Sequence, residues 1–115
     1  MSKVIHADSS EFFRKMMRSF LSELGLESDS FERGADVINA INTGEASFVI
    51  TGLTLADMGG EELIKRIIAS SRSVPVIIVT SNDEAAQAKR LSALGVRAKI
   101  LKSGNWKDEL RNILG

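Results

Sequence analysis

The residues of this chain that could do chemistry share one position, since each stands at or shortly after the end of a hydrophobic run. They are Asp8, Ser9, Gly52, Thr54, Thr80, Ser81 and Lys102. A lysine with neighbouring hydroxyls could hold an anion, and a carboxylate is the kind of ligand that Mg²⁺ prefers. Gly52 lies in the middle of the series and has no side chain to contribute. That absence is the most informative feature of the set.

The composition excludes several kinds of site. The chain has no cysteine and one histidine, His6, which excludes disulfides, thiolate chemistry and histidine-cluster metal sites. We expect His6 to be a buried or half-buried strand residue rather than a catalytic base. The 15 Lys and Arg residues balance the 15 Asp and Glu residues. The net charge therefore favours neither nucleic acid nor an anionic membrane as a partner.

Length and hydropathy predict the kind of chain. No hydrophobic run approaches the roughly 20 residues that a membrane span requires, and the N-terminus lacks a signal-peptide pattern. A length of 115 residues suits one domain with its own core. We therefore expect a cytoplasmic protein in which residues 1–115 form a single domain.

Five hydrophobic runs of strand type alternate with five amphipathic patterns of helix type. The expected strands are residues 4–7, 27–33, 48–51, 76–79 and 98–102, and the expected helices are residues 12–24, 35–41, 60–69, 85–94 and 106–113. Strict alternation requires a parallel sheet with helices on both faces, which is a doubly wound (βα)5 fold of the α/β class. Ligand chemistry in such folds lies at the carboxyl ends of the strands, where the polar residues named above would meet.

Three of the helices have hydrophobic stripes that we expect to pack on the sheet as core. In the first helix, Ser9 or Ser10 is the expected N-cap and Gly25 the expected C-terminal stop. The stripe residues are Phe12, Phe13, Met16, Met17, Phe20, Leu21 and Leu24 in the first helix, Leu63, Ile64, Ile67 and Ile68 in the third, and Trp106, Leu110 and Ile113 in the fifth.

Four motifs, in order along the chain, resemble the receiver domains of two-component response regulators, the CheY-like family. Residues 8–14 (DSSEFFR) are similar to the acidic motif after the family's first strand, and residues 48–60 (FVITGLTLADMGG) resemble the segment with the phosphorylated aspartate. Residues 76–81 (VIIVTS) match the fourth strand and its switch hydroxyl, and residues 93–95 followed by Lys102 reproduce the spacing to the family's lysine. The resemblance spans the whole chain. It implies the strand order 2-1-3-4-5 and a signalling domain rather than an enzyme.

The resemblance also assigns family roles to individual residues. In the family, two acids at the first strand and an acceptor aspartate on the third hold Mg²⁺. Asp8 falls on the first acid, but Ser9 falls on the second and Gly52 on the acceptor, so one carboxylate remains of three. Thr54 falls where the family offers a backbone carbonyl to the metal. Glycine cannot be phosphorylated, and we expect Mg²⁺ binding to be weak or absent, with no other cofactor.

The part of the family site that is retained consists of Thr80, Ser81 and Lys102. Without an acceptor aspartate, the Lys102 ammonium needs a countercharge. Asp8 is the obvious one, and we predict an ion pair between Lys102 and Asp8, either direct or bridged by water.

Three further departures lie near the last strand. Lys99 stands at the switch position, where the family has Tyr or Phe. Ser103 replaces the proline that follows the family's lysine, and since a non-proline cis bond costs about 2.5–4 kcal/mol, we predict a trans bond and an altered loop. Trp106 is expected to fill the core space of the missing aromatic residue.

These losses predict a degenerate receiver, a protein-interaction module that does not depend on phosphorylation. Its partners would be other signalling proteins (a histidine kinase or an output protein) or a second copy of the chain, and neither nucleic acid nor a membrane. The expected partner face is formed by the fourth helix, fifth strand and fifth helix and includes Ala88, Lys89, Lys99, Trp106 and Lys107.

Two alternative functions stay open. The first is phosphorylation at a displaced acid, either Asp8 or Asp57, although Asp57 is otherwise expected to be a solvated loop residue. The second is a sensor that binds a ligand or an anion in the pocket vacated at Gly52.

Overall fold

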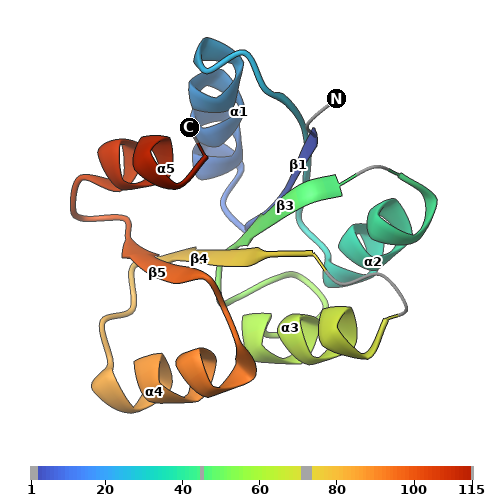
Figure 1. The fold of residues 1–115 in the computed structure, drawn as a ribbon, viewed down its shortest axis with the longest axis vertical. Helices are drawn as coiled ribbons and strands as arrows, with labels where there is room; N and C mark the ends of the chain where they lie inside the picture. The colour runs from blue at the N-terminus through green and yellow to red at the C-terminus, as the bar shows by residue number, and fades with distance from the viewer. Residues whose placement is uncertain (1–2, 45, 71–73, 115) are drawn as a thin grey trace.

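Strands and helices alternate along the described part of the chain (Figure 1). The computed structural model describes residues 3–44, 46–70 and 74–114. The strands are β1 (Lys3–Ala7), β2 (Glu27–Phe31), β3 (Ala46–Thr51), β4 (Val76–Thr80) and β5 (Ala98–Leu101). The helices are α1 (Glu11–Glu23), α2 (Gly34–Thr43), α3 (Gly60–Ala69), α4 (Ala85–Leu94) and α5 (Trp106–Leu114). Every predicted element is present, with boundaries that differ by at most two residues.

The five strands form one parallel sheet in the order β2-β1-β3-β4-β5, with β3 at its centre. Figure 1 shows α1 and α5 on one face of this sheet and α2, α3 and α4 on the other. Hydrophobic side chains from the two faces pack beneath these helices as two separate clusters. The predicted doubly wound α/β fold and its strand order are confirmed.

Burial along the strands follows their place in the sheet. All five residues of β4 are buried, as expected for a continuous β-branched run covered by helices on both sides. The sequence of β2 is polar (ESDSF) and the strand lies at an edge, where charge discourages pairing with other chains. We predicted that β2 would extend to Arg33, but it ends at Phe31 because α2 already begins at Gly34.

Both ends of α1 have the predicted signals. Ser10 is the N-cap, and its Oγ accepts a hydrogen bond of 3.1 Å from the backbone N–H of Phe13. The helix ends at Glu23, and Gly25 follows the C-cap residue with φ at 76°, a left-handed conformation that glycine adopts without strain.

The hydrophobic stripes of α1 and α3 are narrower than predicted. Phe12 is 74% exposed and Ile68 is 52% exposed, so both of these core predictions were wrong. Successive helical residues point about 100° apart. Phe12 therefore falls outside the buried stripe that includes Phe13, and Ile68 falls outside the stripe that includes Ile67.

Trp106 lies in the core between α5, α1 and the sheet. It is 6% exposed, and its ring centroid lies 5.1 Å from that of Phe13 and 5.4 Å from that of Phe20. The prediction that Trp106 fills core space is confirmed. Its assignment to the partner face was wrong, because its ring is covered by the two phenylalanines.

Replacing Trp106 with alanine should therefore lower the free energy of unfolding by about 3–5 kcal/mol, the usual cost of removing a buried aromatic ring. Phe12→Ala is the matched control and should change it by less than about 0.5 kcal/mol, since that ring is exposed. Urea unfolding followed by circular dichroism measures both changes. Equal losses in the two variants would contradict the assignment of Trp106 to the core.

Candidate functional site

The predicted polar residues come together at the carboxyl ends of the strands. They line a hollow of about 220 Å³, hereafter the strand-end hollow. Its lining consists of Asp8, Ser9, Gly52, Leu53, Thr54, Val79, Thr80, Ser81 and Lys102. All seven residues that we singled out from the sequence belong to this lining. Leu53 and Val79 were not singled out, because their side chains have no polar chemistry.

Asp8 is the buried carboxylate of the hollow, with 3% of its surface exposed. Its Oδ1 accepts a hydrogen bond of 2.8 Å from the backbone N–H of Ser10, and its Oδ2 lies 2.9 Å from Nζ of Lys102. The backbone oxygen of Asp8 accepts a further bond of 2.7 Å from Nη1 of Arg14. The predicted ion pair between Lys102 and Asp8 is confirmed, in its direct form.

The Lys102 ammonium lies between two partners. Besides its 2.9 Å approach to Asp8, Nζ lies 4.3 Å from the ring centroid of Phe13 on α1. Attraction between a cation and an aromatic face adds to the ion pair and favours this position. The peptide bond between Lys102 and Ser103 is trans, as predicted. The contact with Phe13 was not predicted, because the sequence does not show which stripe residue lies below the lysine.

Gly52 directly follows the central strand β3. Its backbone conformation does not require glycine. Its N–H donates a bond of 2.9 Å to the carbonyl of Ala7, and its φ lies outside the left-handed region. A Cβ built at Gly52 would lie 3.0 Å from Oδ2 of Asp8. The Asp8 carboxylate therefore lies next to the space that a side chain at position 52 would occupy.

The hydroxyl groups of the hollow differ in how they are used. Thr80 is buried, and its Oγ1 accepts a bond of 3.1 Å from the backbone N–H of Asn82, which shapes the turn after β4. Ser9, Thr54 and Ser81 are exposed at the mouth of the hollow.

His6 is completely buried on β1, on the side of the sheet that α1 covers. Burial lowers its pKa to about 4, an effect that the neighbouring Asp8 opposes and that Lys102 and Arg14 assist. Its Nδ1 lies 3.5 Å from Oγ of Ser30, and its Nε2 has no hydrogen-bond partner within the described residues. The prediction of a buried strand residue is confirmed.

Asp57 does not line the strand-end hollow. The prediction of a solvated loop residue is confirmed, since Asp57 is exposed in the loop between β3 and α3, but its bonds to α2 were not predicted. Its carboxylate accepts backbone hydrogen bonds of 2.7 Å from Gly34 and 3.1 Å from Ala35 at the N-terminus of α2. The bond from Gly34 is the main reason that the pKa of Asp57 is lowered from its ordinary value.

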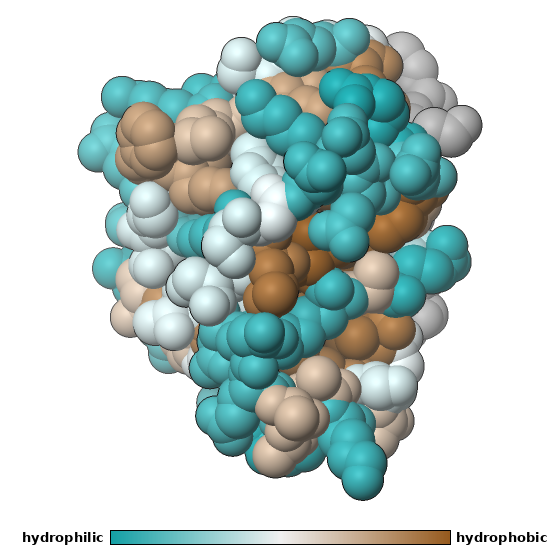
Figure 2. Space-filling view, turned by 90° about the vertical axis from the view of Figure 1, so that its left-hand side faces the viewer, coloured by the Kyte–Doolittle hydropathy of each residue, from teal (hydrophilic) through white to brown (hydrophobic). Residues whose placement is uncertain are grey.

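The face made by α4, β5 and α5 has a groove of about 630 Å³ that includes Ala88 and Lys99 of the predicted partner face. Lys89 and Lys107 are exposed outside its lining, and Trp106 is buried. Figure 2 views this side of the molecule and shows hydrophobic areas broken up by hydrophilic side chains. The remaining groove residues are Asp83, Leu101, Gly104, Asn105, Asp108, Glu109 and Asn112.

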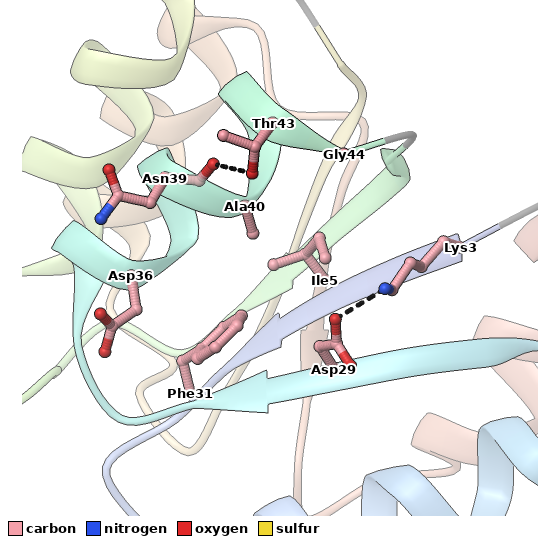
Figure 3. A pocket seen from close by; sticks show the side chains of 9 residues that line it. All are labelled: Lys3, Ile5, Asp29, Phe31, Asp36, Asn39, Ala40, Thr43 and Gly44. Atoms are coloured by element: carbon pink, nitrogen blue, oxygen red, sulfur yellow. Dashed lines mark hydrogen bonds and ion pairs between the residues drawn. The ribbon is translucent and has the colours of Figure 1, made fainter.

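A further hollow of about 410 Å³ lies beside α2 (Figure 3). Figure 3 shows Ala40, Ile5 and Phe31 around it, with an ion pair of 2.8 Å between Lys3 and Asp29 on one side. Among the described residues, it shares no lining residue with the strand-end hollow. It therefore lies outside the predicted site.

The parallel sheet with a carboxylate, hydroxyls and a lysine at its carboxyl ends defines a CheY-like α/β domain. CheY4 of Vibrio cholerae superimposes with a TM-score of 0.87 at 22% identity, over 99% of this chain and 96% of that one. A response regulator receiver protein of Pseudomonas putida gives a TM-score of 0.90 at 21% identity, over 98% and 95% of the two chains. These similarities establish the fold.

Residues 4–114 match the response regulator receiver domain family, and the chain belongs to that family. It is 28% identical to the chemotaxis protein CheY1 of Helicobacter pylori, over 98% of this chain and 97% of that protein. It is 33% identical to the transcriptional regulatory protein GltR of Pseudomonas aeruginosa over 71% of this chain, and 24% identical to the sensor histidine kinase RcsC of Escherichia coli over 86%. The matched regions make up 35% of GltR and 10% of RcsC. Within the described residues, no helix is long and apolar enough to cross a membrane.

The ion pair between Asp8 and Lys102 should contribute measurably to stability. Lys102→Met leaves a buried carboxylate without its countercharge and should lower the free energy of unfolding by on the order of 1–3 kcal/mol. The double variant Asp8→Asn/Lys102→Met should regain part of that loss, because a neutral amide needs no countercharge. Lys65→Met, at an exposed position on α3, is the control. Urea unfolding at neutral pH compares the variants, and a double variant less stable than Lys102→Met would contradict the pairing.

Burial of His6 predicts a specific pH dependence. The folded pKa of about 4 lies below the ordinary 6.5, so the unfolded chain binds the proton more tightly and stability falls as the pH is lowered from 6.5 towards 4. The full loss is about 3 kcal/mol, reached below the folded pKa. In His6→Leu, the slope between pH 6.5 and about 5 should disappear, because the chain has no other histidine. Parallel slopes for the variant and the wild type, measured by urea unfolding, would contradict this assignment.

Proposed function

We propose that this receiver domain is a protein-interaction module of two-component signalling that works without phosphorylation. The observation that supports this most directly is the arrangement at the end of β3. Gly52 offers no acceptor side chain. Asp8, the one carboxylate among the described residues that line the hollow, is already paired with Lys102 at 2.9 Å. From the resemblance to the family we expect the acceptor at position 52, and a glycine there supports the proposal because it has no group that could receive phosphate.

The donor set of the hollow does not suit Mg²⁺. Hard cations of this kind are held by several oxygens, usually with more than one carboxylate. Here the Asp8 carboxylate is shared between the Ser10 amide and the Lys102 ammonium. Within the described residues, no group of three or more His, Cys, Asp or Glu side chains could hold a metal ion. Mg²⁺ therefore has no role in the function that we propose.

The switch residues also favour one fixed conformation. The Thr80 hydroxyl is engaged with the Asn82 amide, and Lys99 stands where the family has an aromatic switch residue. Lys99 lines the groove between α4 and α5 together with Ala88 and Leu101. A partner that binds this groove would therefore meet a lysine where other receivers present an aromatic ring.

The related proteins suggest the kind of partner. GltR is a transcriptional regulatory protein and RcsC is a sensor histidine kinase, and this chain matches only part of each. We propose that the partner is a signalling protein that binds the α4–β5–α5 face, in trans or within a longer chain. A second copy of the domain would be another occupant of the same face.

The alternative functions have weaker support. Asp57 is a poor displaced acceptor, because both of its oxygens accept bonds from α2. Asp8 could receive a phosphoryl group only if its ion pair with Lys102 were broken. An anion in the hollow would likewise have to compete with Asp8 for Lys102, the one cation among the described lining residues.

Titration with beryllofluoride and millimolar Mg²⁺, followed by ¹⁵N NMR, tests the proposal. The wild-type resonances of Asp8, Gly52 and Lys102 should show no saturable shift, because the acceptor and a second metal ligand are missing. The variant Ser9→Asp/Gly52→Asp restores both carboxylates and should gain saturable shifts at the strand ends. It requires the Asp8 carboxylate to move by a few tenths of an ångström away from the new Cβ, which would otherwise lie 3.0 Å from Oδ2.

The wild-type titration has a clear contrary result. Saturable shifts in the wild type at the same concentrations would overturn the proposal, since they would show a working phosphoryl site. The restored variant shows that the scaffold can respond when the side chains are present. Gly52→Ala is the control for the added Cβ alone and should stay unresponsive.

A further inference from the structure

The loop that follows Gly52 is attached to the start of α2. Asp57 in this loop accepts backbone bonds of 2.7 Å from Gly34 and 3.1 Å from Ala35, and the N–H of Ala56 donates a bond of 2.8 Å to the carbonyl of Glu32. These three hydrogen bonds connect residues 56 and 57 with residues 32 to 35, and we call them the α2 clasp.

Gly34, the first residue of α2, also contacts the loop. A Cβ built at Gly34 would lie 2.5 Å from Sδ of Met58, so the methionine packs directly against this glycine and would have to shift for a larger residue. The N-cap residue of α2, Arg33, makes no side-chain capping bond. Asp57 therefore supplies from a distant loop the cap that the helix lacks locally. Its negative charge also suits the positive end of the helix dipole.

The clasp holds a loop that forms one wall of the strand-end hollow. Leu53 and Thr54 line the hollow, and Thr54 pairs with Gly59 across the loop. Within the loop, the N–H of Leu55 donates a bond of 3.0 Å to the carbonyl of Met58, and the N–H of Gly60 donates a bond of 2.9 Å to the carbonyl of Leu53. The loop is thus closed on itself at its base and attached to α2 at its tip.

We propose that Asp57 is a positioning residue that holds loop 53–59 against α2 and so keeps the wall of the strand-end hollow in one conformation. This inference rests on the proposed function, because a domain that works without phosphorylation needs another means of ordering the loop beside its site. The hydrogen bonds of the α2 clasp order the loop, and they involve only the Asp57 carboxylate and backbone groups of this chain. The hollow keeps its shape whether or not a cation or a phosphoryl group is present.

Amide hydrogen exchange by NMR, in the presence of a chelator, tests this role. In Asp57→Asn, the amides of Leu55, Ala56 and Gly60 should exchange about tenfold faster or more, because bonds to a charged acceptor have been lost and local opening is easier. The resonances of Gly52 and Thr54 should shift as well. Asp36→Asn is the matched control, since Asp36 lies in the first turn of α2 and makes none of the clasp bonds. It should leave the loop unchanged.

A purely local role for Asp57 has a different signature. If only the amides of Gly34 and Ala35 exchanged faster in Asp57→Asn, Asp57 would be a helix cap and the proposal would be overturned. If Asp57→Asn does not fold, amide exchange in the wild type still tests the proposal. Loop amides that exchange as fast as unprotected ones in the wild type would equally overturn the proposal.

The outcome can be separated from that of the proposed function. Beryllofluoride binding by the wild type would refute phosphorylation independence, whatever the exchange rates are. Fast loop exchange in a domain that ignores beryllofluoride would refute the clasp alone.

Discussion

The burial of one charged group, the Asp8 carboxylate, constrains the entire carboxyl end of the sheet. A charge so far removed from water is tolerated only with a countercharge and hydrogen bonds. Asp8 obtains them from α1, through the Ser10 amide, and from the end of β5, through Lys102. Its own backbone N–H bonds the carbonyl of Phe31 on β2, and its carbonyl receives Arg14. One residue thus connects the end of β1 with α1, β2 and β5.

The core beneath this group is also what positions the lysine. Lys102 lies over Phe13, which packs against Trp106, which in turn packs against Phe20. These rings belong to the hydrophobic cluster between the sheet and the helices α1 and α5. The same packing that stabilises the fold therefore orients the Lys102 ammonium in the strand-end hollow. The position of Lys102 therefore depends on the core rings beneath it.

The receiver fold does not require a particular side chain at position 52, because fold and chemistry depend on different residues. The fold depends on β-branched strand residues and helix stripes, which this chain retains. The chemistry depends on a few side chains at the strand ends, and at Gly52 the side chain is absent although the backbone does not need glycine. The Asp8 carboxylate lies next to the space that a side chain at position 52 would occupy. The loop after Gly52 is hydrogen-bonded to the start of α2. Of the polar side chains that line the hollow, Asp8, Lys102 and Thr80 have partners within the domain.

The sequence by itself determined the elements, the parallel sheet and the polar residues of the strand-end hollow, because these follow from the period of hydrophobic residues and from the position of polar residues after strands. It also implied the pairing of Asp8 with Lys102, since a lysine without its usual partner needs a countercharge. Only the tertiary structure decided the role of Asp57, which bonds Gly34 at a separation of 23 residues, and the place of Phe13 beneath Lys102. Local patterns contain no signal for such contacts, because helix packing brings those residues together.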